Sequence, residues 1–176
     1  SAISLERKTY LINFGYNSVN DEFDSNNLNS QWSWIRENKE NWSLSKNQGN
    51  LTISVKDGGL KETSNNAENL ILQNANSDWT IETKIKFSRK PSGLSQHSGV
   101  IAYQDDDNYL MLVYGAGARF RGQSGNQSGS VYLISEENGN MKTIETINLE
   151  ADFLNNNSIY FKLEKVGETY SASYSA

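Results

Sequence analysis

Hydrophobic and polar side chains alternate strictly along residues 79–87. The odd-numbered positions, from Trp79 to Phe87, are apolar or Thr, whereas the even-numbered positions are Thr, Glu and Lys. Successive side chains of a strand point to opposite faces, so this pattern predicts a β-strand with one buried face and one face in water. The same alternation recurs at residues 51–55 and 159–165. Further strands are predicted at residues 10–16, 31–36, 69–73, 131–134, 142–149 and 169–174.

Residues 99–114 predict a β-hairpin. Two runs rich in β-branched and aromatic residues flank the polar turn Asp105–Asn108. Asp and Asn bond to nearby backbone groups and tolerate the dihedral angles of a tight reversal. Other turn signals, such as Asp57–Gly59 and Glu137–Gly139, separate the strands at fairly even spacing, and helical periodicity is almost absent. The chain is therefore predicted to be all-β, with a two-sheet antiparallel β-sandwich or jelly roll.

Composition narrows the class of protein. The 176 residues suffice for one domain with a proper core, and we expect a monomer. The net charge of −5, with no run of basic residues longer than two, disfavours binding to nucleic acid or to an anionic membrane surface. The chain has no Cys and one histidine, His97. This composition excludes disulfide bonds and disfavours most zinc sites and Ser-His-Asp catalytic triads. No apolar run approaches the roughly 18 residues of a membrane span.

Residues for acid–base catalysis are sparse. A jelly-roll glycosidase needs two carboxylates that face each other across one cleft, and its Glu-x-Asp-x-Glu strand is absent here. Glu82 stands alone on its strand, and Glu136 is expected in a turn together with Glu137. His97 has polar neighbours and is expected to be a solvated loop residue. The sequence therefore predicts that the chain is not itself an enzyme.

Two acidic segments could hold a structural calcium ion, the cofactor that this composition leaves open. One contains Asp21 and Asp24, and the other contains Asp105 and Asp107. Carboxylate oxygens are the ligands that Ca²⁺ prefers. The alternative interpretation is a hairpin tip and a turn-capping pair, in which the carboxylates accept backbone hydrogen bonds.

Aromatic residues offer a possible platform for sugars. Trp32 and Trp34 share one face of the strand predicted at residues 31–36, and strand parity places Arg36 on the same face. Aromatic faces stack on the C–H faces of sugar rings, but either tryptophan could instead fill the core. Because Arg36 is hard to bury, we expect its face to be the wet, concave one. The other candidate carbohydrate-binding residues are Tyr103, Tyr109, Tyr114, Arg119 and Arg121, of which Tyr109 and Tyr114 fall on opposite faces of the hairpin.

Residues 21–36, followed by Asn41-Trp42-Ser43-Leu44, resemble the opening of a concanavalin A-like module. Residues 69–73, 78–87 and 98–109 continue the pattern in the family's order. Modules of this kind follow the catalytic propeller in β-xylosidases and related family 43 glycoside hydrolases. The resemblance covers residues 20–176 and leaves residues 1–19 as an N-terminal extension or linker. Family members usually continue with one more strand, which leaves open a truncation at the C-terminus.

The resemblance implies a jelly roll with a non-catalytic role beside the catalytic domain of a hydrolase. The leading hypothesis is a carbohydrate-binding accessory module of a secreted, extracellular bacterial enzyme that degrades plant polysaccharides. Its partner would be a polysaccharide or oligosaccharide of the xylan or arabinoxylan type, bound on the concave sheet. One alternative is a laminin-G-like adhesion or protein-interaction domain with a calcium ion at its rim. The other is a jelly-roll glucanase or polysaccharide lyase.

Overall fold

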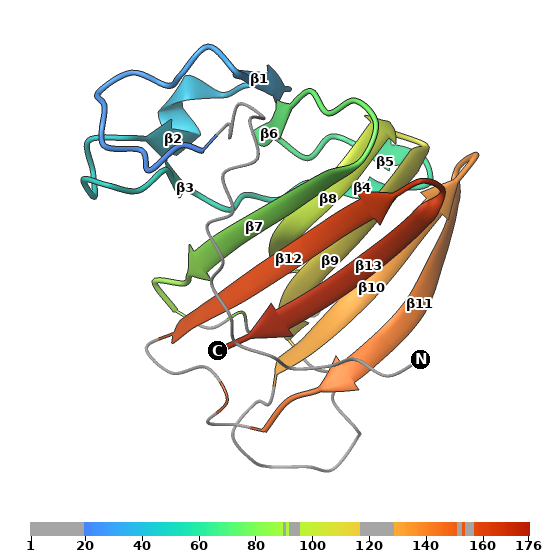
Figure 1. Ribbon diagram of the computed structural model, residues 1–176. Coiled ribbons are helices and arrows are strands. Elements are labelled where there is room, and N and C mark those ends of the chain that lie inside the picture. The colour runs from blue at the N-terminus through green and yellow to red at the C-terminus, as the bar shows by residue number, and fades with distance from the viewer. Residues whose placement is uncertain (1–19, 90, 92–95, 117–128, 151–152, 154–156) are drawn as a thin grey trace. The chain divides into compact units, whose positions relative to one another are not determined.

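The computed structural model describes residues 20–89, 91, 96–116, 129–150, 153 and 157–176. These residues form strands β1 to β13 and one short 3-10 helix, so the predicted all-β class is confirmed (Figure 1). The strand predicted at residues 10–16 lies outside the described residues. Within the described part of the chain, no helix is long and apolar enough to cross a membrane.

The described chain divides into two compact units. The sandwich unit comprises Lys61–Thr63 and Asn76–Ala176. The N-terminal unit comprises the described residues up to Leu60, that is residues 20–60, together with Ser64–Ala75. The sandwich unit contains two antiparallel sheets, one with the strand order β11-β10-β9-β8 and one with the order β13-β12-β7 (Figure 1). Their strands are β7 (Trp79–Lys86), β8 (His97–Asp105), β9 (Asn108–Ala116), β10 (Gly129–Glu137), β11 (Asn140–Asn148), β12 (Ser158–Val166) and β13 (Thr169–Ser175).

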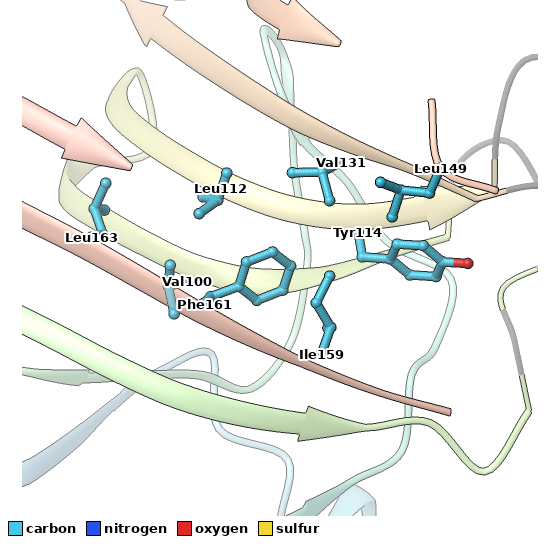
Figure 2. Close-up of a cluster of buried hydrophobic side chains, with 8 residues drawn as sticks. All are labelled: Val100, Leu112, Tyr114, Val131, Leu149, Ile159, Phe161 and Leu163. Atoms are coloured by element: carbon cyan, nitrogen blue, oxygen red, sulfur yellow. The ribbon is translucent and has the colours of Figure 1, made fainter. Parts of the chain in front are cut away.

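The core of the sandwich unit lies between these two sheets. Alternate residues of β12, namely Ile159, Phe161 and Leu163, have almost no exposed surface. They meet side chains from β8, β9 and β10, including Leu112 and Val131, as Figure 2 shows. The odd-numbered apolar residues of β7 pack against the same cluster, as their alternation predicts. Burial of apolar surface at about 25 cal/mol per Å² is the main force that holds the sheets together.

Two hairpin tips meet at one end of the four-stranded sheet. Asp105 pairs with Asn108, and the Asp105 Oδ1 atom accepts hydrogen bonds from the Asp107 N–H and the Asn108 side chain. The predicted β8–β9 turn is therefore confirmed. The β10–β11 turn uses Asn138 and Gly139 at φ 51° and 72°, the left-handed conformation that an Asn-Gly hairpin turn requires. The Gly139 N–H donates to the Asp107 carbonyl, which ties the tips together.

The N-terminal unit is built from short strands. Strand β1 pairs with β6 and β2 pairs with β3, both antiparallel, and the predicted strand at residues 51–55 shrinks to two residues because it pairs with only two. Asn69 is buried at φ 58°, where its side chain accepts the Asn38 N–H and donates to the Asn38 carbonyl. The elements are β1 (Trp32–Ile35), η1 (Lys39–Asn41), β2 (Trp42–Ser43), β3 (Thr52–Ile53), β4 (Leu60–Lys61), β5 (Ser64–Asn65) and β6 (Leu70–Gln73), with Lys61 assigned to the sandwich unit.

Candidate functional site

The tryptophans of β1 pack within the N-terminal unit. The Trp34 ring lies 5.0 Å from the Trp42 ring, and both residues are half-buried. Trp32 stacks on Phe23, and its indole N–H donates to Asp21. These contacts use much of the aromatic surface that a sugar would need, which favours the alternative in which the tryptophans stabilise the fold.

Arg36 does not share the face of Trp32 and Trp34 in the way that parity predicts. Strand β1 ends at Ile35, and Arg36 adopts a left-handed backbone with φ 52°. The alternation of an extended strand cannot continue through such a residue. The Arg36 Nε atom donates to the Ala67 carbonyl at 2.7 Å, so the guanidinium holds a loop of its own unit.

Two of the predicted carbohydrate-binding tyrosines are buried. Tyr114 is 2% exposed, and its ring lies in the core 5.3 Å from the Phe87 ring. Tyr109 is 6% exposed on the opposite face of β9, where its hydroxyl donates to Glu136 at 2.8 Å. The predicted opposite facing of the two residues is confirmed. Their burial does not favour a role as sugar contacts, because a buried ring offers no surface to a polymer in solution.

Tyr103 and the two arginines have different outcomes. Tyr103 is half-buried opposite Tyr109, and its hydroxyl donates to the Asp106 side chain at 2.8 Å. Arg119 and Arg121 lie outside the described residues, so the structure says nothing about them. Among the candidate tyrosines, the structure brings Tyr103 and Tyr109 together on one face of the sheet and places Tyr114 on the other.

The four-stranded sheet has a second face, turned away from the core, which we call the outer face. Tyr103, Tyr109 and Glu136 form one row across it near the hairpin tips. His97, Gly115 and Ser130 form another row at the opposite end. Across β8, β9, β10 and β11 in turn, the rows are Tyr103-Tyr109-Glu136-Met141, Ile101-Met111-Ile134-Thr143, Gly99-Val113-Tyr132-Thr146 and His97-Gly115-Ser130-Asn148.

Glu136 is the one carboxylate in these rows, and it is buried. The expectation that Glu136 lies in a turn is wrong, because β10 continues to Glu137 and Glu136 is only 1% exposed. One carboxylate oxygen accepts the Glu62 N–H and the other accepts the Tyr109 hydroxyl, each at 2.8 Å. Burial, followed by the hydrogen bond and the charge of Glu136, raises the pKa of Tyr109. Ser130, Tyr132, Ile134 and Glu136 are alternate residues of β10, and alternate residues of a strand share a face. This alternation in the sequence could have placed Glu136 on the outer face.

The opposite end of the outer face carries a half-buried aromatic pair. His97 is the first residue of β8 rather than a loop residue, and its ring lies 5.5 Å from the Tyr132 ring at 56°. The imidazole covers Gly115, where a Cβ atom would lie 2.3 Å from the His97 Cδ2 atom. Burial lowers the pKa of His97 and so favours the neutral ring. The expectation of a solvated loop histidine is therefore wrong.

Polar groups flank this aromatic pair. The Ser130 hydroxyl donates to the Asn148 side-chain oxygen at 2.9 Å, which leaves the exposed Asn148 amide without a partner among the described residues. The Tyr132 hydroxyl donates to the Ala116 carbonyl at 3.0 Å, which fixes the tilt of the ring. We call His97, Gly115, Ser130, Tyr132 and Asn148 the His97 platform.

The four candidate calcium ligands already serve as turn residues where their contacts are defined. Asp21 accepts the Phe23 N–H and the Trp32 indole, and Asp105 caps the β8–β9 turn. Within the described ranges, no group of three or more His, Cys, Asp or Glu side chains is placed to hold a metal ion. Asp24 and Asp107 are exposed and join no such group.

Comparison with known proteins places this arrangement in a family. Residues 20–176 match the family described as the β-xylosidase C-terminal concanavalin A-like domain. Comparison with curated proteins gives no significant match. The match spans most of the chain and agrees with the two antiparallel sheets of the sandwich unit. The chain therefore belongs to the family of β-xylosidase C-terminal concanavalin A-like domains, which are accessory domains of glycoside hydrolases.

Proposed function

We propose that this domain is a non-catalytic module that binds xylan-type or arabinoxylan-type glycans at the His97 platform. The single observation that carries the proposal is the half-buried pair of His97 and Tyr132 beside the Asn148 amide, which has no hydrogen-bond partner among the described residues. Sugar sites commonly combine an apolar aromatic surface with a few polar groups that fix orientation. Membership in a family of β-xylosidase domains makes a xylan-type chain the appropriate ligand to test.

The platform has the chemistry for an uncharged sugar ring. Burial lowers the pKa of His97, so the imidazole is neutral at neutral pH and presents an apolar ring. The C–H face of a pyranose packs on such a ring and on Tyr132. The Asn148 amide can donate to a sugar hydroxyl, and Gly115, which has no side chain, leaves room for the His97 ring to lie over it. Each group therefore has a separate part in the contact.

The state of Glu136 supports a non-catalytic role. Glycoside hydrolysis needs two carboxyl groups on opposite sides of the scissile bond. Glu136 has no second carboxylate in the rows of the outer face, and both of its oxygens accept hydrogen bonds from the protein. A buried carboxylate held in this way stabilises the sheet rather than meeting a polymer. The bond-breaking step would then belong to the hydrolase domain that this module accompanies.

We further propose that the module belongs to a secreted bacterial enzyme. Plant polysaccharides are large polymers that an organism meets outside its cells, so an enzyme that degrades them acts there. The accessory module would keep the catalytic domain close to the polymer by raising its effective concentration at the surface.

Affinity gel electrophoresis tests the proposal with gels that contain xylan, arabinoxylan, β-glucan or levan. We expect retardation by the xylans that falls at least about fivefold for His97→Ala and about two- to fivefold for Asn148→Ala. Asn140→Ala, at the other end of β11, is the matched control and should bind as the parent chain does. Absence of retardation on every glycan contradicts binding and indicates a purely structural domain. Retardation that His97→Ala leaves unchanged shows that the sugar binds elsewhere.

A further inference from the structure

The three-stranded sheet presents a second surface, on the opposite side of the sandwich unit's core from the His97 platform. Its outward-facing residues alternate with the core residues of β7 and β12. Tyr160 lies in the central strand β12, directly between Lys84 on β7 and Ser175 on β13. It is 45% exposed, so its ring faces solvent in the middle of the sheet. Lys84, Lys86, Tyr160 and Ser175 form what we call the Tyr160 patch.

Positive charge gathers at this end of the sheet. The Lys84 Nζ atom lies over the Tyr160 ring, 4.9 Å from its centroid, in cation–π geometry. Lys86 points to the same side two residues later, about 7 Å along the strand. Neither lysine forms an ion pair with a described residue. Ion pairs occur farther along the face, where Lys162 contacts Glu82 at 3.7 Å and Glu164 at 3.9 Å.

Both carboxylates that the structure describes on this face contact Lys162, and the two ammonium groups at the Tyr160 end have no carboxylate partner among the described residues. The whole chain carries a net charge of −5, so a local cationic surface stands out from its background. Such a patch attracts an anionic chain within about 10 Å at 0.1 M salt, whereas the rest of the surface repels it.

We propose that the Tyr160 patch binds a carboxylated polysaccharide, that is, a chain of sugar rings bearing uronic-acid groups. A sugar ring packs against the surface of Tyr160 that Lys84 leaves uncovered, while a uronate carboxylate meets the ammonium groups of Lys84 and Lys86. The cation–π contact holds one ammonium group beside the ring before the ligand arrives. The Ser175 hydroxyl is placed across the ring to bond to sugar oxygens. This proposal does not depend on glycan binding at the His97 platform.

A carboxylated sugar fits this surface better than the other anionic polymers do. An uncharged glycan would leave the two ammonium groups without a partner. A nucleic acid needs an extended basic face for successive phosphates, and the ion pairs of Lys162 with Glu82 and Glu164 interrupt the positive charge after two lysines. One exposed aromatic ring beside two ammonium groups matches a polysaccharide whose sugar rings can stack on the aromatic ring and carry carboxylates that bind the ammonium groups.

Binding of the 176-residue chain to immobilised glucuronoxylan and to polygalacturonate, at about 0.05 M and about 1 M NaCl, tests the proposal. We expect binding at low salt that weakens at least tenfold at high salt. The double variant Lys84→Gln/Lys86→Gln should lose about four- to twentyfold in affinity. Tyr160→Thr should lose about two- to tenfold, and Tyr160→Phe should retain most of the affinity, because the ring supplies the contact. Lys142→Gln, an exposed lysine on β11, is the matched control.

The outcomes separate this surface from the other one. His97→Ala should leave binding to polygalacturonate, which has no xylan backbone, unchanged, even if binding to neutral xylan is absent altogether. Salt-sensitive binding that Lys84→Gln/Lys86→Gln does not weaken would overturn the proposal. Equal affinity for dextran sulfate, which has no carboxylates, or for double-stranded DNA would also overturn it, because charge alone would then explain the attraction. Far-UV circular dichroism of Tyr160→Thr checks that the sheet is intact, and Tyr160→Phe tests the ring without changing its packing.

Discussion

Replacing Tyr109 by Phe should destabilise the sandwich unit, because it removes one of two hydrogen bonds to a buried carboxylate. Glu136 is 1% exposed and Tyr109 is 6% exposed, so water cannot replace the lost donor. The hydroxyl lies 2.8 Å from one carboxylate oxygen, and the Glu62 N–H lies 2.8 Å from the other. After the substitution, Glu136 keeps a single donor and one oxygen is left buried without a partner.

The size of the effect follows from the charge on the acceptor. A hydrogen bond to a charged group contributes about 1.5–3 kcal/mol, roughly twice the value for a neutral pair. Phe fills nearly the same space as Tyr, so no large cavity adds to the loss. We therefore expect Tyr109→Phe to lower the free energy of unfolding by about 1.5–3 kcal/mol. At about 2–4 °C per kcal/mol, the melting temperature should fall by about 3–12 °C.

Urea unfolding followed by tryptophan fluorescence measures this change. Tyr170→Phe is the matched control, because Tyr170 is 44% exposed and its substitution should change the free energy of unfolding by less than about 0.5 kcal/mol. A double-mutant cycle with Glu136→Gln should give a coupling energy of at least about 0.5 kcal/mol. A loss for Tyr109→Phe no larger than that of the control would mean that the buried carboxylate does not need its hydroxyl donor.

Four further predictions follow from single contacts. Because the pKa of Tyr109 is raised, the unfolded chain releases a proton above pH 10 that the folded chain retains, so stability should fall as pH rises through this range. The urea midpoint of Tyr109→Phe should fall less steeply with pH than that of the parent chain, and equal slopes for the two chains would contradict this prediction. Because burial lowers the pKa of His97, the unfolded chain takes up a proton below pH 6.5 that the folded chain does not, so stability should fall as pH falls. The melting temperature should therefore drop between about pH 7 and about pH 5, and His97→Gln should make this drop smaller. Phe161→Ala should cost about 3–5 kcal/mol in urea unfolding, whereas Tyr160→Thr, on the other face of β12, should cost less than about 1.5 kcal/mol; similar losses would mean that the faces are misassigned. Gly115→Ala should displace the His97 ring and weaken xylan retardation at least about threefold, and unchanged retardation would separate His97 from the glycan.

Strand positions were predictable where the pattern was local and periodic. The alternation from Trp79 to Phe87 became β7, with its apolar side chains in the core, because side-chain direction in a strand depends only on the strand itself. The Asp105–Asn108 turn formed as predicted, because Asp and Asn carry their own hydrogen-bonding groups into the turn. The family resemblance, which extends over several strands, was confirmed for residues 20–176.

Burial of individual site residues was less predictable. The turn expected at Glu136 and Glu137 lies beyond them, at Asn138 and Gly139, and Glu136 is buried by contacts with Tyr109 and the Glu62 backbone. His97 looked solvated from its polar neighbours along the chain, but its ring is covered through the neighbouring strands β9 and β10. Arg36 left the predicted strand face because its backbone turns left-handed just after Ile35.

The sequence alone determined the all-β class, the positions of the long strands, the β8–β9 turn and the family. These depend on period-two alternation and on turn residues, which act between neighbours along the chain. Only the tertiary structure decided that Tyr109 and Tyr114 are buried on opposite faces, that Glu136 is held by two donors, and that His97 pairs with Tyr132. Parity assigns a side chain to a face, but what covers that face comes from residues far away in the sequence.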